Sequence, residues 1–104
     1  MEKIVKQGFL YDFYGALLNE HQKNIYEAFI YDNMSLSEIA SEHGISRQGV
    51  HDLIKRCDKA LEEYENKLHL VEKFLSIKDD VVLIETKADD EEIKKLAGKI
   101  LEQL

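Results

Sequence analysis

Side chains that can bond to nucleic-acid bases and phosphates gather between residues 46 and 56 of this 104-residue chain. A Gln can bridge adenine and an Arg can bridge guanine by paired hydrogen bonds, and Lys and Arg also bind phosphates. On a helix these polar residues fall on the side away from Val50, Leu53 and Ile54. The alternative is an ordinary hydrated helix surface. The candidate DNA-binding residues are Ser46, Arg47, Gln48, His51, Lys55 and Arg56.

Asp52 lies on the same surface and is unfavourable for binding a polyanion. Arg56 follows it four residues later, at the spacing at which opposite charges pair on a helix for a few tenths of a kcal/mol. The spacing therefore predicts a pair between Asp52 and Arg56.

The elements that must position these residues form a predicted helix-turn-helix. Ser35 and Glu38 have capping-box spacing, and Gly44 suits the left-handed backbone that usually ends a helix. Ser46 can cap the helix that follows. In a helix-turn-helix the second helix offers its N-terminal residues to the DNA major groove. The apolar residues expected between the two helices are Ile39, Ala40, Ile45, Val50 and Leu53.

The charge distribution bounds the kind of ligand. The formal net charge is −7, but residues 35–59 hold four basic and four acidic residues and are neutral. Residues 1–34 carry a net charge of −2 and residues 60–104 a net charge of −5. Strong phosphate binders are usually basic, so the overall charge counts against tight non-specific nucleic-acid binding. A local basic patch remains compatible with it.

Composition favours an all-α protein without catalytic chemistry. The chain has no proline and is rich in aliphatic residues, Glu and Lys, which favour helices. Its four histidines and single Cys57 show no metal spacing, and no nucleophile stands beside a base. We therefore expect no enzyme, no cofactor and no metal site, and we interpret Cys57 as a small buried apolar residue.

The remaining helices follow from caps and periodicity. Apolar residues at three- and four-residue steps predict a helix over residues 3–17. Asn19 and Gln22 have capping-box spacing for a second helix to about Tyr31, and Asp32-Asn33 should end it. Asp89 and Glu92 have the same spacing before a C-terminal amphipathic helix. Residues 76–88 are ambiguous, and we predict a helix there because no second strand is evident.

An apolar seam predicts that the recognition helix is long. Eight residues alternate at steps of four and three, which is a heptad seam, and they predict one helix from Ser46 to Leu75. We place a domain boundary between residues 60 and 61, with a helical extension, an oligomerisation segment, over 61–104. The seam residues are Val50, Ile54, Cys57, Leu61, Tyr64, Leu68, Val71 and Leu75.

The second half of this seam needs a partner, because a helix-turn-helix core reaches only its first half. Either the C-terminal helix covers it within the chain, or a second copy does. An exposed stripe of this length is unusual on a monomer, so we predict a homodimer. Its dimerisation residues would be Leu61, Tyr64, Leu68, Val71 and Leu75.

Localisation follows from what the sequence lacks. No apolar run is long enough to cross a bilayer. The stretch MEKIVKQGFLYDF has no signal-peptide core and no small-residue cleavage site. We therefore expect a cytoplasmic protein without membrane contact.

From Leu17 to about Leu61 the chain resembles region 4 of bacterial sigma factors, the domain that reads the −35 element. The resemblance rests on Leu36-Ser37-Glu38-Ile39-Ala40 followed by Gly44-Ile45-Ser46. The stretches FYGALLNEHQ, SRQGVHDLIKR and YENKL are more similar to the YlxM family of small bacterial helix-turn-helix proteins. That likeness covers residues 9–75 well and the tail loosely.

The resemblance implies a sigma-region-4-like fold with a long recognition helix and a C-terminal helical appendage. YlxM proteins are typically encoded beside the signal recognition particle GTPase or its receptor, which implies a link to that pathway. The expected function is a regulator that binds double-stranded DNA. The alternative is a non-catalytic adaptor that binds the RNA or the GTPase of the particle. His43 and Gly49 depart from the family pattern, which prefers a large apolar residue and Ala or Thr there.

Overall fold

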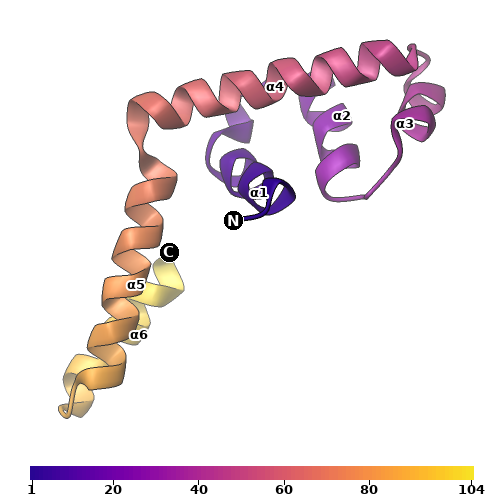
Figure 1. The fold of residues 1–104 in the computed structure, drawn as a ribbon. Helices are drawn as coiled ribbons and strands as arrows, with labels where there is room; N and C mark the ends of the chain where they lie inside the picture. Colours follow the sequence, from indigo (N-terminus) through magenta and orange to yellow (C-terminus); the bar gives the residue numbers. More distant parts are fainter. The chain divides into compact units, whose positions relative to one another are not determined.

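The computed structural model describes all residues from Met1 to Leu104, and it confirms the all-α class (Figure 1). The chain divides into two compact units, Met1–Leu68 and His69–Leu104, called here the core unit and the hairpin unit. The core unit contains α1 (Lys3–Tyr14), η1 (Gly15–Leu17), α2 (Glu20–Ile30), α3 (Leu36–His43) and α4 (Arg47–Leu68). The hairpin unit contains α5 (Leu70–Lys87) and α6 (Glu91–Gln103).

In the core unit, α4 is the element on which the other helices pack. Helices α1, α2 and α3 all contact it and lie on the same side of it (Figure 1). Its inward face is apolar at helical spacing and forms the core together with buried side chains from α1, α2 and α3. Those with essentially no exposed surface are Tyr14, Ile25, Tyr26, Ile39, Val50, Cys57 and Leu61.

The first helix is shorter than its periodicity predicts. α1 ends at Tyr14, and the 3-10 turn η1 replaces the last predicted residues. A Cβ at Gly15 would lie 2.7 Å from the ring of Tyr11, so the turn depends on close approach to that ring. The next helix starts as predicted, because Asn19 and Gln22 form a complete capping box. Asn33 then takes a positive φ of 52° in the turn before α3.

Helix α4, the predicted recognition helix, ends earlier than the heptad seam predicts. α4 stops at Leu68, His69 adopts a left-handed φ of 56°, and α5 begins at Leu70. The prediction of one helix to Leu75 is therefore wrong. Histidine tolerates left-handed backbone better than most residues, and its ring Nδ1 lies 3.2 Å from a carboxylate oxygen of Glu72. The unit boundary accordingly falls after Leu68 and not at residue 60.

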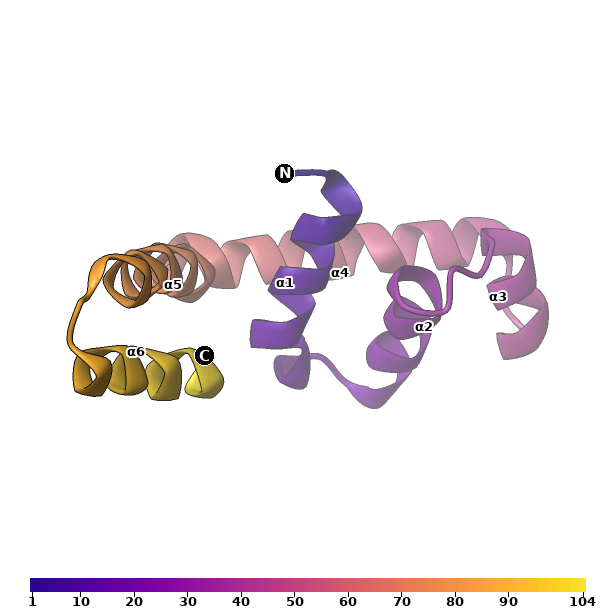
Figure 2. The ribbon, with the colours of Figure 1, turned by 90° about the horizontal axis from the view of Figure 1, so that it is seen from below.

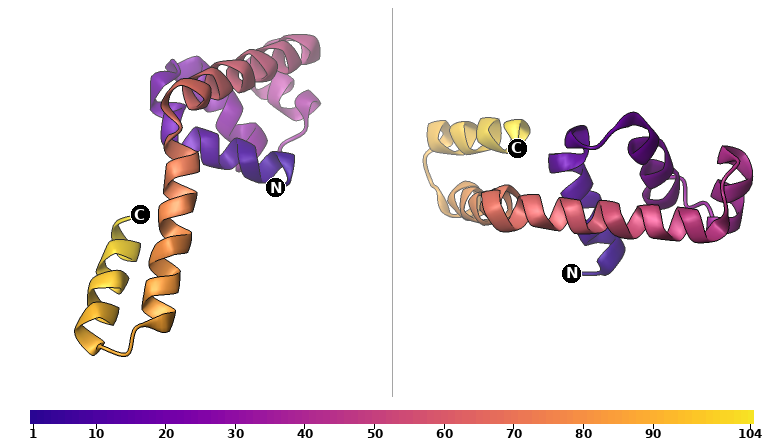
Figure 3. Two further views of the ribbon diagram at one scale, coloured as in Figure 1. Left: turned by 60° about the vertical axis from the view of Figure 1, so that its left-hand side comes forward. Right: turned by 90° about the horizontal axis from the view of Figure 1, so that it is seen from above.

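The hairpin unit consists of two antiparallel helices that lie side by side (Figures 2 and 3). The ambiguous stretch 76–88 is helical to Lys87, as predicted. Asp90, and not Asp89, caps α6, because its Oδ1 accepts from the backbone N–H of Glu92 at 2.8 Å. Only Val71, Val81 and Ala97 are buried in this unit. None of the helices is long and apolar enough to span a membrane.

Candidate nucleic-acid interface

The turn between α3 and α4 is built from the local signals that the sequence predicts. Ser35 Oγ accepts from the backbone N–H of Glu38, and the Glu38 carboxylate accepts from that of Ser35, both at 3.1 Å. The second bond lowers the pKa of Glu38. Gly44 is left-handed at φ 66°, ψ 31°, and the N–H of Ile45 donates back to Ala40 at 3.1 Å. The left-handed Gly44 therefore ends α3, and the chain changes direction there before α4 begins.

Ser46 starts α4, as its position predicts, by accepting from the backbone N–H of Gly49 at 2.9 Å. A Cβ at Gly49 would lie 3.0 Å from that hydroxyl, so the glycine leaves room for the cap. With Val50, Leu53 and Ile54 buried, the polar residues of the helix are turned outward. Ser46, Arg47, Gln48, Lys55 and Arg56 are exposed, and His51 is partly buried.

The predicted site residues form two neighbouring rows on α4. At 100° per residue, Arg47, His51 and Lys55 share one row, whereas Gln48 and Arg56 lie on the next. A hollow of about 370 Å³ is bordered by Leu36, Arg47, Gln48 and His51. The first turn of α4 therefore presents cationic and amide groups around an open surface depression.

Asp52 has a different partner from the predicted one. Its Oδ1 accepts from the side-chain amide of Gln48 at 2.9 Å and lies 3.5 Å from His51 Nδ1. The pKa of Asp52 is lowered mainly by the Gln48 bond, and to a lesser extent by His51 and by the charge of Arg56. The predicted ion pair with Arg56 is therefore wrong, because the Asp52 carboxylate bonds instead to the side-chain amide of Gln48, one turn earlier on the helix. Gln48 is held within the helix surface in this arrangement.

A second feature lies along the α1 side of the same helix. Two hollows of about 320 and 300 Å³ share four lining residues, so they form one groove, called here the flank groove. The first of them also shares Leu36 and His51 with the hollow at the start of α4. The residues shared by the two hollows are Lys3, Gln7, Lys55 and Asp58, and Lys6, Lys59 and Glu62 line the second hollow.

Three lysines of the flank groove are absent from the site residues that the sequence predicts, namely Lys3, Lys6 and Lys59. Lys59 follows Lys55 by one turn, and that spacing is a signal that could have included it. Lys3 and Lys6 are brought to α4 by the packing of α1, about fifty positions away in sequence, and no local pattern reports this contact.

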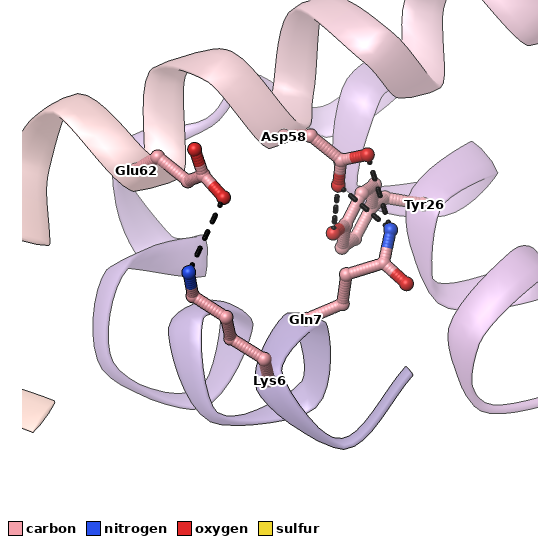
Figure 4. A network of polar contacts seen from close by, with 5 residues as sticks. All are labelled: Lys6, Gln7, Tyr26, Asp58 and Glu62. Carbon is pink, nitrogen blue, oxygen red and sulfur yellow. Dashed lines mark hydrogen bonds and ion pairs between the residues drawn. The ribbon is translucent and has the colours of Figure 1, made fainter. Parts of the chain in front are cut away.

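A partly buried polar network joins α1 and α2 to α4 beside the groove (Figure 4). Gln7 donates from its amide nitrogen to both carboxylate oxygens of Asp58, at 3.0 and 3.1 Å, and the Tyr26 hydroxyl donates to the same carboxylate at 2.5 Å. Burial, and then this hydrogen bond, raise the pKa of Tyr26 above its usual range. Lys6 adds an ion pair to Glu62 at 3.6 Å. The network fixes the position of Lys3 and Lys6 relative to α4.

The seam residues proposed for dimerisation do not form one exposed surface. Leu61 is fully buried in the core unit, so the expectation that it lies beyond the reach of the core is wrong. Tyr64 packs beside Tyr14, with ring centroids 5.9 Å apart. Leu68 is 47% exposed and ends α4, whereas Val71 is buried in the hairpin unit. Leu75 is half-buried on α5.

Cys57 lies on the inward face of α4 and is fully buried, in agreement with its interpretation as a small apolar residue. Burial, with a smaller contribution from Asp58, raises the pKa of its thiol to about 11. The thiol is therefore protonated near neutral pH, where a reactive cysteine would be a thiolate.

Comparison with known proteins places this geometry in a family. The profile of the UPF0122 family, described as YlxM / p13-like helix-turn-helix proteins, matches residues 1–100. A UPF0122 protein of Shouchella clausii is 47% identical over 71% of this chain and 68% of its own length. One from Streptococcus thermophilus is 45% identical over 86% of this chain and 83% of its own. One from Clostridium acetobutylicum is 39% identical over 96% and 92%, respectively.

Proposed function

The chain belongs to the UPF0122 family of YlxM / p13-like helix-turn-helix proteins, and from that premise we propose that it is a non-catalytic regulator that binds double-stranded DNA. The observation that carries the proposal is the capped α3–α4 turn, after which the first turns of α4 expose Arg47, Gln48, Lys55 and Arg56. A helix presented in this way fits the DNA major groove.

The site residues have different proposed roles. Arg47 and Gln48 occupy the first turn of α4, the part of a recognition helix that approaches base edges. Lys55 and Arg56 lie two turns further along, where phosphates flank the groove, and His51 lies between the two sets. The hydrogen bond to Asp52 holds the Gln48 amide along the helix surface, so it opposes the turn of that side chain toward a base edge.

Binding of fluorescein-labelled DNA from the operon of this protein tests the proposal. Arg47→Ala and Gln48→Ala should each cost about 1–3 kcal/mol at the cognate site and reduce discrimination between sequences. Lys55→Ala should weaken all sequences alike and flatten the salt dependence. Asp52→Ala should tighten binding, because it frees Gln48 and removes a negative charge. Small and equal effects from all four variants would contradict groove reading.

An adaptor that binds the RNA or the GTPase of the signal recognition particle is the second candidate. The observation that favours it is the acidity of the chain, because a net charge of −7 is unusual for a protein that binds nucleic-acid phosphates; it therefore favours the GTPase over the RNA as the ligand of the adaptor. Parallel titrations against operon DNA, signal recognition particle RNA and the GTPase, each at several salt concentrations, separate the two candidates. Binding of the GTPase alone, insensitive to Arg47→Ala, would support the adaptor.

We also propose that the protein is a homodimer joined through the hairpin unit. That unit is shorter than the roughly 40 residues below which oligomerisation or another staple is usually needed. On α5, Leu70, Ile77 and Ile84 recur every seven residues and are all exposed, which is the pattern of a helix–helix seam. A second copy would supply a second α4, and dimeric helix-turn-helix proteins use two such helices to read two half-sites.

Sedimentation at several concentrations tests the dimer. The unsubstituted chain should sediment as a dimer, and Ile77→Glu with Ile84→Glu should shift it to the monomer. Lys78→Glu is the matched control, because it lowers the net charge of α5 by as much as the two Ile→Glu substitutions do and leaves the seam residues unchanged. A monomeric parent chain, or a dimer that survives the double substitution, would contradict this interface.

A further inference from the structure

We propose that the flank groove holds the phosphate backbone of the nucleic acid whose bases α4 contacts, with the amines of Lys3, Lys55 and Lys59 binding successive phosphates of one strand. The inference rests on the proposed function, since it takes DNA as the ligand. It extends the interface beyond the helix-turn-helix to α1.

The groove carries the opposite charge to the unit that contains it. The core unit has eight basic and twelve acidic residues, for a net charge of −4. The flank groove collects four of those amines against two carboxylates, so its local charge is positive. Lys6 is paired with Glu62, whereas Lys3, Lys55 and Lys59 form no ion pair. Three cations are thus available to a polyanion on a surface that is otherwise acidic.

The carboxylate of Asp58 is already satisfied within the protein. It accepts two hydrogen bonds from Gln7 and one from Tyr26, which fixes its oxygens toward α1 and α2 (Figure 4). Its structural role therefore explains why Asp58 lines a groove whose net charge is positive. A phosphate at the rim meets lysine amines on both walls, Lys3 from α1 and Lys55 and Lys59 from α4.

The spacing of the cations on α4 matches a length of one DNA strand. From Arg47 to Lys59 the helix rises about 18 Å at about 1.5 Å per residue. A strand of B-DNA carries one phosphate per about 3.4 Å of axis, so this length spans roughly five phosphates. Because Lys55 lines the flank groove and also belongs to the exposed row of α4, a strand beside the recognition helix would enter the groove directly.

The apolar floor of the groove, formed by Ile4, Phe29 and Ile54, would equally suit an acidic protein segment. Nucleic acid is favoured by continuity, because the hollow at Arg47 and Gln48 shares Leu36 and His51 with the flank groove. An acidic segment gains nothing from that connection, whereas a duplex contacts both surfaces at once.

The test is the salt dependence of binding to a fluorescein-labelled random-sequence duplex of about 20 base pairs, where each phosphate contact contributes about 0.9 to the slope of log K against log salt. Lys3→Gln with Lys59→Gln should lower that slope by about 1.8. Lys23→Gln with Lys67→Gln removes the same charge outside the groove and should leave the slope unchanged. Lys3→Arg with Lys59→Arg should restore it. Circular dichroism of each variant confirms that it is folded.

The possible failures are distinguishable. If the duplex binds and Lys3→Gln with Lys59→Gln leaves the slope unchanged, the inference is overturned while the proposed function stands. If neither this duplex nor operon DNA binds to the unsubstituted chain, the proposed function fails and the inference fails with it. If operon DNA alone binds, the same slopes are measured on operon DNA and judged in the same way. If poly-L-glutamate binds instead and releases on substitution of the two lysines, the occupant of the groove is an acidic protein and the inference is again overturned.

Discussion

The core unit and the hairpin unit bury their apolar side chains to different extents. The core unit folds three helices onto α4, seals seven large side chains and adds internal polar bonds between helices. The hairpin unit buries only Val71, Val81 and Ala97 and leaves both of its helices with exposed Leu, Ile and Val. Both units have helices with apolar residues at helical spacing. The difference lies in the number of helices that pack on each one, because α4 is covered by three helices and α5 by α6.

This contrast favours a different role for each unit under the proposed function. Under that function, a core fixed by buried contacts would hold the candidate interface of α4 in one geometry, which base reading would require. A hairpin with an uncovered apolar surface has stability to gain from a partner, in proportion to the area removed from water. All five tyrosines lie in the core unit, so tyrosine fluorescence reports on that unit alone, whereas helical circular dichroism reports on both.

The largest expected effect comes from truncating the core. Leu61→Ala should lower the free energy of unfolding of the core unit by about 2–5 kcal/mol, because it leaves a cavity where the side chain is fully buried. Leu96→Ala on α6 is the matched control, since Leu96 is 54% exposed, and it should cost less than about 1 kcal/mol. Urea denaturation of the two variants, followed by tyrosine fluorescence and by circular dichroism, measures both. Equal losses would refute the contrast between the units.

The next effect comes from the polar network. Asp58→Ala should cost about 2–3 kcal/mol, because it leaves the buried Tyr26 hydroxyl and Gln7 amide without an acceptor. Asp12→Ala removes the acceptor of the Tyr31 hydroxyl at an exposed site and should cost less than half as much. Tyrosine-detected urea denaturation compares them. A loss from Asp58→Ala no greater than that from Asp12→Ala would show that the network adds nothing to the core.

A smaller effect is expected at the turn. Gly44→Val should destabilise the core unit by about 1–2 kcal/mol, because a β-branched residue is strained at a positive φ. Space is not the cause, since no atom lies within 4 Å of a Cβ built there. Gly8 has equally open surroundings but lies within α1, so Gly8→Ala should stabilise by about 0.5–1 kcal/mol. Thermal midpoints that moved in the same direction would contradict this account of the turn.

The sequence predicts the features that depend on neighbouring residues. The caps at Asn19, Ser35 and Ser46 and the stop at Gly44 are confirmed, because a cap is formed by residues two to four positions apart. The helix-turn-helix and the outward row of α4 follow from the same local signals together with helical periodicity.

What the sequence does not predict depends on distant contacts or on unmarked breaks. The heptad steps continue through Leu68 and Val71, yet the helix is broken at His69, which carries no strong breaker signal. Leu61 is covered by helices that precede it by tens of residues, so its burial could not be inferred from the seam. The bonds from Gln7 to Asp58 and the lysines of α1 at the flank groove likewise arise only after α1 packs on α4.

The smallest expected effect is a loss of stability in mild alkali that is confined to the core unit. Burial raises the pKa of Cys57 from 9.0 to about 11, and burial with the charge of Glu27 raises that of Tyr11 from 10.0 to about 12. Because the unfolded groups release their protons first, the stability that these groups contribute is complete below about pH 9 and is lost as pH rises toward the folded values. Between pH 8 and pH 9.5 only the first part of that loss is reached.

The hairpin unit contains neither cysteine nor tyrosine and provides an internal control for this pH dependence. Urea midpoints measured at pH 8 and pH 9.5 should fall for the tyrosine signal, which reports on the core unit, and should fall less for circular dichroism, to which the helices of both units contribute. Cys57→Ala should reduce the fall, because it removes the group that titrates first, even though it lowers the midpoint at both pH values. A fall of the same size in Cys57→Ala and in the unsubstituted chain would mean that the buried thiol is not its source.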